Sequence, residues 1–164
     1  MAELLQHSAA PEAVSELSIP EAIVYATQLQ RQRQLDGAEA LYGRVLEAAP
    51  GHPDALHFLG LLRFQRGRPQ DAVALLLQAI AQAPDFPDFH GNLGNLLTAL
   101  GRPAEAEESY RRAIALDPGR ADFHNNLGVL YRVTGDQENA EDELQRAVQL
   151  DPRHFRAYNN LGML

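Results

Sequence analysis

Residues 123–152 read FHNNLGVLYRVTGDQENAEDELQRAVQLDP, and residues 89–118 read FHGNLGNLLTALGRPAEAEESYRRAIALDP. The second stretch precedes the first by a 34-residue step, and the two share a Phe-His pair, a Leu-Gly pair and a closing Asp-Pro. Agreement at a fixed spacing is typical of a chain built from one repeated structural unit. The rest of the chain extends the same spacing in both directions.

Several columns of residues keep the 34-residue step through nearly the whole chain. They hold a proline, a Leu-Gly pair and an alanine: Pro50, Pro84, Pro118 and Pro152; Leu59-Gly60, Leu93-Gly94, Leu127-Gly128 and Leu161-Gly162; Ala38, Ala72, Ala106 and Ala140. Because these columns are independent of one another, coincidence does not explain them. The sequence therefore predicts a repeat array.

Each unit carries the signals of two helices joined by a tight turn. In the third unit, apolar residues at helical spacing predict a first helix over 88–100. Gly101 suits the left-handed position that ends a helix, and Pro103 suits the first turn of the next one, which ends before Pro118. Residues 18–21, Ser-Ile-Pro-Glu, form a capping box that opens the first unit.

Glycine recurs inside the first helix of the units, at Gly60, Gly94 and Gly128. A glycine in the middle of a helix costs about 1 kcal/mol relative to alanine, so some gain must offset it. We expect these glycines to allow close approach of the second helix, whose alanine column would lie on the facing side.

The residue types at these columns resemble the tetratricopeptide repeat family, whose pattern is an aromatic residue, Leu-Gly, Tyr, Ala, an aromatic residue and Pro. The fourth unit follows it closely: His124, Leu127-Gly128, Tyr131, Ala140, Leu144 and Pro152. The resemblance implies an all-α fold, a right-handed α-solenoid of helix-turn-helix hairpins with four full repeats and a fifth half-repeat. The array would cover 18–164, with repeats at about 19–52, 53–86, 87–120, 121–154 and 155–164. Residues 1–17 would be partly disordered or would cap the first hairpin.

Composition excludes several classes of function. The chain has 164 residues, no cysteine and a formal net charge of −8, so cysteine chemistry is excluded and a duplex-binding basic stripe is not expected. No stretch approaches the ~18 apolar residues that span a membrane, and the N-terminus does not read as a secretory signal. We therefore expect a cytoplasmic protein with no nucleic-acid partner and no membrane partner.

In the family that this chain resembles, the first helix of each repeat lines the inner, concave surface. The columns that this resemblance assigns to a peptide-binding groove are His57, Phe58, Leu61 and Phe64 in the second repeat; Asn92 and Asn95 in the third; Asn125, Asn126, Val129 and Arg132 in the fourth; and Asn159 and Asn160 in the last. The carboxylate clamp of chaperone-tail receptors does not fit, because it uses lysine and this chain has none.

Asn92, Asn126 and Asn160 share one column, and a row of amides can hold a peptide backbone because each side chain donates and accepts. The row and the segments around it resemble the repeats of bacterial O-linked N-acetylglucosamine transferase-like proteins. Val24 and Phe58 occupy the same column in the first two units, so the row covers only the C-terminal half. The alternative is that these amides tie the first helix to neighbouring backbone or face water.

No catalytic, cofactor or metal site is predicted. His90 and His124 occupy the column where the family places a packed aromatic residue, and they lie one repeat apart rather than at ligand spacing on one helix. No nucleophile–base pair, phosphate loop or paired carboxylates occur. The acidic runs of the second helices, such as residues 105–108 and 141–143, are expected to face solvent.

The leading hypothesis is a non-catalytic module that binds a peptide or protein segment in the concave groove. The alternative is the N-terminal substrate-selecting arm of a larger enzyme of the glycosyltransferase, sulfotransferase or hydroxylase type. A third interpretation is an assembly scaffold that acts through its convex face or its ends. Because the fifth repeat stops after its first helix and closes on Met163 and Leu164, we expect a fragment of a longer protein and self-association through this half-repeat.

Overall fold

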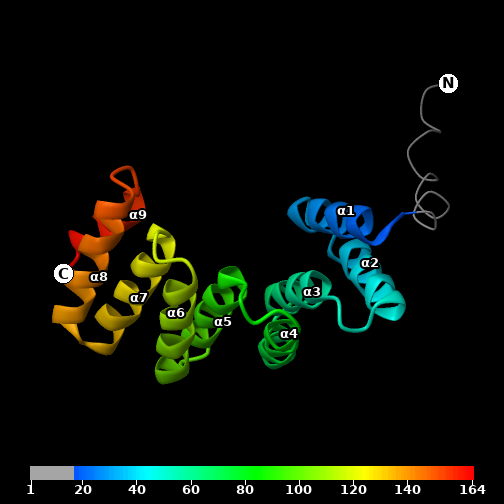
Figure 1. Ribbon diagram of the computed structural model, residues 1–164, viewed down its shortest axis with the longest axis horizontal. Coiled ribbons are helices and arrows are strands. Elements are labelled where there is room, and N and C mark those ends of the chain that lie inside the picture. The colour runs from blue at the N-terminus through cyan, green and yellow to red at the C-terminus, as the bar shows by residue number, and fades with distance from the viewer. Residues whose placement is uncertain (1–16) are drawn as a thin grey trace.

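The computed structural model describes residues 17–164, and the N-terminal segment predicted over 1–17 lies outside the described residues except for Leu17. The described part is all-α, as predicted, with no strand. It forms four helical hairpins and one further helix in chain order along the long axis (Figure 1): α1 Ile19–Arg31, α2 Leu35–Ala48, α3 Pro53–Gln65, α4 Pro69–Gln82, α5 Pro87–Ala99, α6 Pro103–Leu116, α7 Ala121–Thr134, α8 Gln137–Leu150 and α9 Phe155–Leu161.

The helix ends follow the local signals of the sequence. Helix α5 begins and ends one residue earlier than the predicted 88–100, and α6 begins at Pro103. Ser18 precedes α1, and the Glu21 carboxylate accepts a hydrogen bond from the Ser18 backbone N–H at 2.9 Å. This is the carboxylate half of the predicted capping box.

The turn inside each hairpin contains one residue in the left-handed region. Its φ is 73° at Gly67, 68° at Gly101 and 88° at Gly135, and it is 65° at Arg33 in the first hairpin. The four positions share one column of the repeat. The backbone therefore has the same left-handed turn even where the sequence lacks the glycine that favours it.

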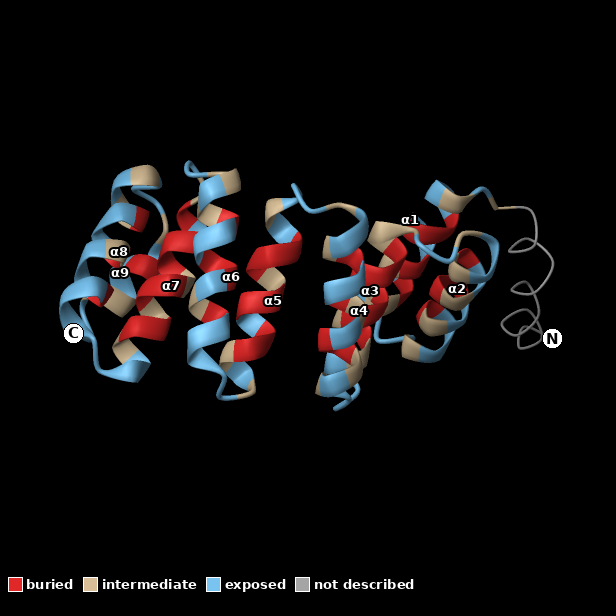
Figure 2. Ribbon diagram, turned by 60° about the horizontal axis from the view of Figure 1, so that its bottom comes forward, coloured by how far each residue is buried: buried red, intermediate tan, exposed pale blue. Residues whose placement is uncertain are grey.

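The core lies between the helices of each hairpin and between neighbouring hairpins, and Figure 2 shows buried residues on the sides of helices that face other helices. The mid-helix glycines sit where the prediction placed them. A Cβ added at Gly94 would lie 2.6 Å from the ring of Tyr110, and one at Gly128 would lie 2.7 Å from Leu144 Cγ. Each glycine thus receives a large side chain of the second helix, four residues beyond the alanine column.

At three of the four steps along the array, the first helices of neighbouring repeats, α1, α3, α5, α7 and α9, lie closer together than any two of the second helices, α2, α4, α6 and α8. Helix α1 contacts α3, α5 contacts α7 and α7 contacts α9, whereas no two second helices have an equally extensive contact in the described residues. An array curves toward the side on which its helices are closer. The first helices therefore line its inner surface, and the second helices form its outer surface.

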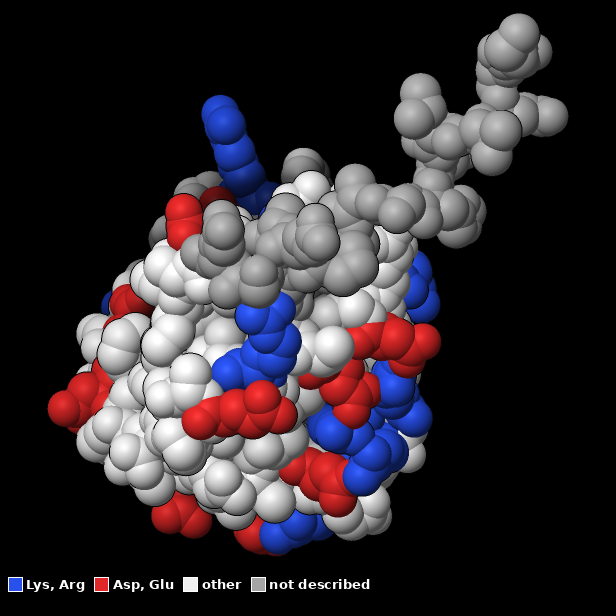
Figure 3. All heavy atoms as spheres, turned by 90° about the vertical axis from the view of Figure 1, so that its right-hand side faces the viewer, with Lys and Arg blue, Asp and Glu red and all other residues white. Residues whose placement is uncertain are grey.

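No helix within residues 17–164 is both long enough and apolar enough to cross a membrane. Figure 3 views the array from the end that carries α1 and α2, and basic and acidic side chains lie next to one another on this face. Ion pairs also link neighbouring helices, as between Arg63 of α3 and Glu39 of α2 at 2.5 Å.

Candidate functional site

The structure places all the predicted groove residues on the first helices, but not all of them face solvent. Phe64, Asn95 and Asn159 are exposed, whereas His57 and Asn125 are only 4% and 5% exposed. The others are half-buried: Phe58, Leu61, Asn92, Asn126, Val129, Arg132 and Asn160. A buried side chain cannot present its polar face to a ligand. His57 and Asn125 therefore act as supports beneath the surface rather than as contact residues.

Amide side chains bridge successive first helices along the inner surface. Asn126 donates from Nδ2 to Asn95 Oδ1 at 3.0 Å, and Asn160 donates from Nδ2 to Asn125 Oδ1 at 2.9 Å. Asn92 Nδ2 lies 2.9 Å from His57 Nε2. The sequence predicts either that the asparagine column holds a peptide or that it ties the first helix to neighbouring backbone. The structure contains ties between helices, but their partners are side chains rather than backbone.

The same bonds leave part of each amide free. Asn95 Oδ1 accepts from both Tyr110 Oη, at 2.8 Å, and Asn126 Nδ2, so its oxygen is occupied while its NH₂ group is not. Asn92 has the opposite polarity, because its NH₂ group is bonded to His57 and its oxygen has no partner in the described residues. Helix α5 therefore presents the free oxygen of Asn92 as an acceptor and the free NH₂ group of Asn95 as a donor, three residues apart.

Aromatic side chains enclose His57. Its ring centroid lies 4.9 Å from that of Phe58 and 4.6 Å from that of Phe89. Burial lowers the pKa of His57 from 6.5 to about 4, because a charged imidazolium is poorly solvated there. A neutral His57 accepts from Asn92 at Nε2, and its Nδ1 is buried with no hydrogen-bond partner among residues 17–164.

A second set of contacts one repeat apart was not predicted. Arg120 donates to Asp88 at 2.5 Å and lies over the Phe123 ring, 4.9 Å from its centroid, while His154 Nε2 lies 3.0 Å from Asp122 Oδ1. Asp88 raises the pKa of the Arg120 guanidinium further above its usual range. The 34-residue step of Asp88 and Asp122 is visible in the sequence, and it could have revealed this column.

Gly91 belongs to the inner surface as well. A Cβ at this position would lie 2.5 Å from Phe123 Cε1, so only glycine lets the Phe123 ring of α7 rest on α5. One repeat earlier, Phe89 packs in the same manner against His57.

These residues surround two adjoining hollows on the inner surface. One, of about 360 Å³, is polar and is lined by Asp88, Gly91, Asn92, Asn95, Arg120, Asp122, Phe123, Asn126 and Arg156. The other, of about 250 Å³, is lined by Asn95, Thr98, Ala99, Tyr110, Asn126 and Val129. Asn95 and Asn126 line both, so the two hollows form one strip across α5 and α7. Asn159 and Asn160 lie beyond it on α9.

The remaining histidines and acids have structural contacts. His90 Nε2 lies 2.8 Å from the carbonyl oxygen of Pro84, and the corresponding atom of His124 lies 3.3 Å from that of Pro118. Within residues 17–164, no three His, Asp or Glu side chains gather as metal ligands would.

The prediction that the acidic runs face solvent is wrong for Glu107 and Glu143, which are half-buried. Glu107 accepts a hydrogen bond from the Tyr131 hydroxyl at 2.9 Å, and Glu143 lies 2.7 Å from His124 Nδ1.

Comparison with known proteins identifies the repeat. Models of the tetratricopeptide repeat match residues 29–100, 63–116 and 92–155. The crystal structure of MamA is 26% identical, with a TM-score of 0.76 over 84% of this chain and 81% of that one. No relative was found among curated proteins.

Two further structures share the fold at lower identity. YrrB, a TPR protein with an unusual peptide-binding site, is 21% identical with a TM-score of 0.75, over 90% of this chain and 75% of that one. PilF of Pseudomonas aeruginosa is 18% identical with a TM-score of 0.84, over 88% of this chain and 66% of that one. The finer resemblance to O-linked N-acetylglucosamine transferase repeats stays a prediction.

Proposed function

Because the chain belongs to the tetratricopeptide repeat family, we propose that it is a non-catalytic interaction module that binds an extended peptide segment along its inner surface. The peptide would lie across the first helices α3, α5, α7 and α9, over the strip formed by the two hollows. An extended peptide carries unpaired backbone N–H and C=O groups, which need partners wherever binding removes them from water.

The observation that carries the proposal is the pair of free amide groups on α5. Asn95 offers its NH₂ group to a peptide carbonyl, and Asn92 offers its oxygen to a peptide N–H. The bonds from Tyr110 and His57 hold the two amides in these orientations before a ligand arrives, so less side-chain entropy is lost on binding. Each such bond contributes about 1 kcal/mol net, and several are needed for useful affinity.

The N-terminal half of the same surface has a different chemistry. Phe64 is 40% exposed on α3, and Phe58 and Leu61 are half-buried beside it. These side chains suit apolar residues of the ligand, because burial of apolar surface is favourable. The ligand that fits the whole surface is therefore a segment with apolar side chains at one end and an accessible backbone at the other.

The fold is compatible with this role. YrrB has the same architecture, and it is a TPR protein with a peptide-binding site. The residues proposed to contact the peptide are those that the hydrogen bonds of this chain leave free, Asn92 and Asn95.

The test is to select peptides from a random display library on the purified protein and to measure their affinity for variants by fluorescence anisotropy. Asn95→Ala and Phe58→Ala should each weaken binding by about 10-fold, equivalent to the loss of one well-formed contact. Gln78→Ala provides the matched control, because Gln78 is an exposed polar residue of α4, away from the strip. Affinity that is unchanged in both groove variants would count against the inner surface as the binding site.

A further inference from the structure

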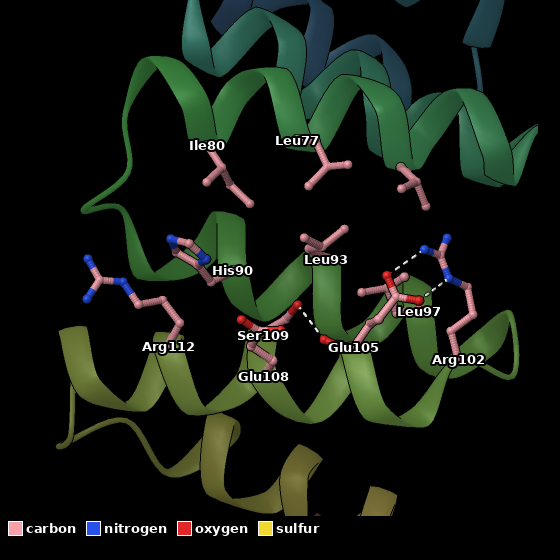
Figure 4. Close-up of a pocket in the computed structure, with 11 residues that line it drawn as sticks. Leu77, Ile80, His90, Leu93, Leu97, Arg102, Glu105, Glu108, Ser109 and Arg112 are labelled. Atoms are coloured by element: carbon pink, nitrogen blue, oxygen red, sulfur yellow. Dashed lines mark hydrogen bonds and ion pairs between the residues drawn. The ribbon is translucent and has the colours of Figure 1, made fainter.

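A cleft of about 500 Å³, larger than either hollow of the inner surface, lies on the other side of the array between α4 and α6. Figure 4 shows Leu77 and Ile80 of α4 facing Leu93 and Leu97 of α5, which form the floor, while α6 provides the opposite wall. We call this the α4–α6 cleft. Its floor is apolar, and Leu77 is 51% exposed at its edge.

The equivalent position in the next hairpin is closed by the chain itself. Tyr131 occupies the column of Leu97, and its hydroxyl donates to Glu107 at 2.9 Å and accepts from Arg111 at 2.9 Å. Arg111 also pairs with Glu107 at 2.8 Å. Three polar side chains thus bridge α6 and α7 where the α4–α6 cleft has apolar residues.

The preceding hairpin is closed by different residues at the same columns. Arg63 occupies the column of Leu97, and Glu39 occupies the column of Val73. The two form an ion pair at 2.5 Å, and Arg66 adds a second contact to Glu39 at 2.8 Å. The open cleft is therefore not a general property of the repeat. It arises because Val73 and Leu97 replace polar residues that close both neighbouring positions, and because Leu77 replaces Arg111 of the next hairpin.

We propose that the α4–α6 cleft binds an amphipathic helix of a partner protein. Along α4 the cleft is lined by Val73, Leu77 and Ile80, which follow the i, i+4, i+7 spacing of one helix face over about 10 Å. The apolar anchors of an amphipathic helix have the same spacing and the same length. Leu77 and Ile80 are accessible above a floor of buried Leu93 and Leu97, so an apolar anchor of a partner helix would enter the cleft against α4.

The charges at the rim specify which helix fits. Arg102 is paired with Glu105 at 2.6 Å and Arg112 with Asp85 at 3.1 Å, whereas Glu108 is exposed and has no ion pair within residues 17–164. The charge left for a partner is therefore negative. A helix with lysine or arginine beside its apolar face complements it, and this complementarity sets orientation and specificity more than affinity.

The test uses two labelled synthetic peptides of about four helical turns with the same composition. The first places leucines at i, i+4 and i+7 with flanking lysines, and the second distributes the leucines so that they form no face. Fluorescence anisotropy should show binding of the first peptide at least about 10-fold tighter than that of the second. Leu77→Glu should weaken it by about 10-fold, while Ala81→Glu, on an exposed α4 position outside the cleft, should not.

A second variant closes the cleft with residues that the chain already uses. V73E/L77R/L97Y copies Glu107, Arg111 and Tyr131 into the preceding hairpin, and it should abolish binding while circular dichroism shows unchanged helicity. Asn95→Ala should leave binding of this peptide unchanged, because Asn95 lies on the inner surface; this separates the proposal from the peptide-binding one.

Three results would overturn the proposal. The wild-type protein could bind neither peptide, it could bind both equally, or Leu77→Glu could bind as tightly as the wild type. If sedimentation shows a dimer of the wild type that V73E/L77R/L97Y abolishes, the cleft belongs to a second copy of the chain rather than to a partner helix.

Discussion

Asn126 of α7 donates a hydrogen bond to Asn95 of α5 across 3.0 Å, and the same Asn95 oxygen accepts the Tyr110 hydroxyl at 2.8 Å. One amide oxygen thereby joins three helices of two successive repeats. The separation of the two asparagines in the chain is shorter than the period of the repeat, so they do not share a column. The bond joins two positions that are not equivalent in the repeat, so the repeat pattern of the sequence does not predict it.

This pair is predicted to contribute little to stability. Asn95 is exposed and Asn126 is half-buried, so water replaces the bond when it is lost. A double-mutant cycle of Asn95→Ala and Asn126→Ala, measured by urea unfolding, should give a coupling free energy of about 1 kcal/mol or less. A coupling above about 2 kcal/mol would mean that the amides serve mainly to hold the array together, which would weaken the ligand-binding interpretation.

Two mid-helix glycines are predicted to respond in opposite directions to alanine. Gly128→Ala should lower the free energy of unfolding by about 1–3 kcal/mol, because the added Cβ would meet Leu144 Cγ at 2.7 Å and the Ala140 carbonyl oxygen at 3.1 Å. Gly43→Ala is the matched control in α2. Its Cβ would have no atom within 4 Å, so the change should stabilise by about 0.5–1 kcal/mol. Equal effects of the two substitutions would contradict the close approach of α7 and α8.

The turn of the first hairpin is predicted to improve with glycine. Arg33 has a φ of 65°, close to the values that Gly67 and Gly101 have in the equivalent turns. Arg33→Gly should raise the free energy of unfolding by about 0.5–1 kcal/mol, because relief of left-handed strain exceeds the added entropy of the unfolded chain. Gly101→Ala should lower it, since alanine would be strained there. Thermal unfolding followed by circular dichroism distinguishes the two, and a loss of stability in Arg33→Gly would refute the argument.

The array should lose stability in mild acid through His57. Burial lowers the pKa of this group to about 4 in the folded state, against 6.5 in the unfolded state, so the unfolded chain takes up the proton first. The contribution of His57 is complete above pH 6.5 and declines as the pH falls toward 4. Between pH 7 and pH 5 it should decrease by about 2 kcal/mol.

His57→Phe isolates this effect from the titration of carboxylates. Phenylalanine keeps an aromatic ring between Phe58 and Phe89 but carries no proton. Urea titrations at pH 7 and pH 5 give the free energy of unfolding of both proteins. From pH 7 to pH 5, the value for the variant should fall by about 2 kcal/mol less than the value for the wild type. Parallel pH profiles of the two proteins would show that His57 is accessible to solvent or protonated in the folded state.

Much of the architecture could be predicted from residues close together in the chain. The spacing of leucines around Leu93, the position of Pro103 and the glycine at Gly101 place α5 and α6 within one residue. The close approach of α6 to Gly94 also follows, because glycine in a helix indicates a close neighbour, but the side chain that meets Gly94 is Tyr110 rather than the expected alanine. The predicted inner-surface columns do lie on the first helices.

The candidate site was less predictable, because burial depends on which side chain the next repeat supplies. His57 reads as a groove residue until Phe89 of the following hairpin is placed against its ring. The column of Asp88 and Asp122 is visible in the sequence, but nothing there shows that Arg120, directly before α7, reaches Asp88 of α5. The α4–α6 cleft likewise depends on three residues from two helices, and only a comparison of columns shows that they differ from their equivalents.

The sequence by itself determined the helices, their turns and their order, because helical spacing, capping and left-handed turns are properties of a few adjacent residues. It also determined the repetition, since the same local signals recur with the 34-residue period. Only the tertiary structure decided which amides remain free, which histidine is buried and which cleft stays open. These depend on side chains brought together from successive hairpins, whose contacts are set by the packing distance and angle between helices rather than by any local preference.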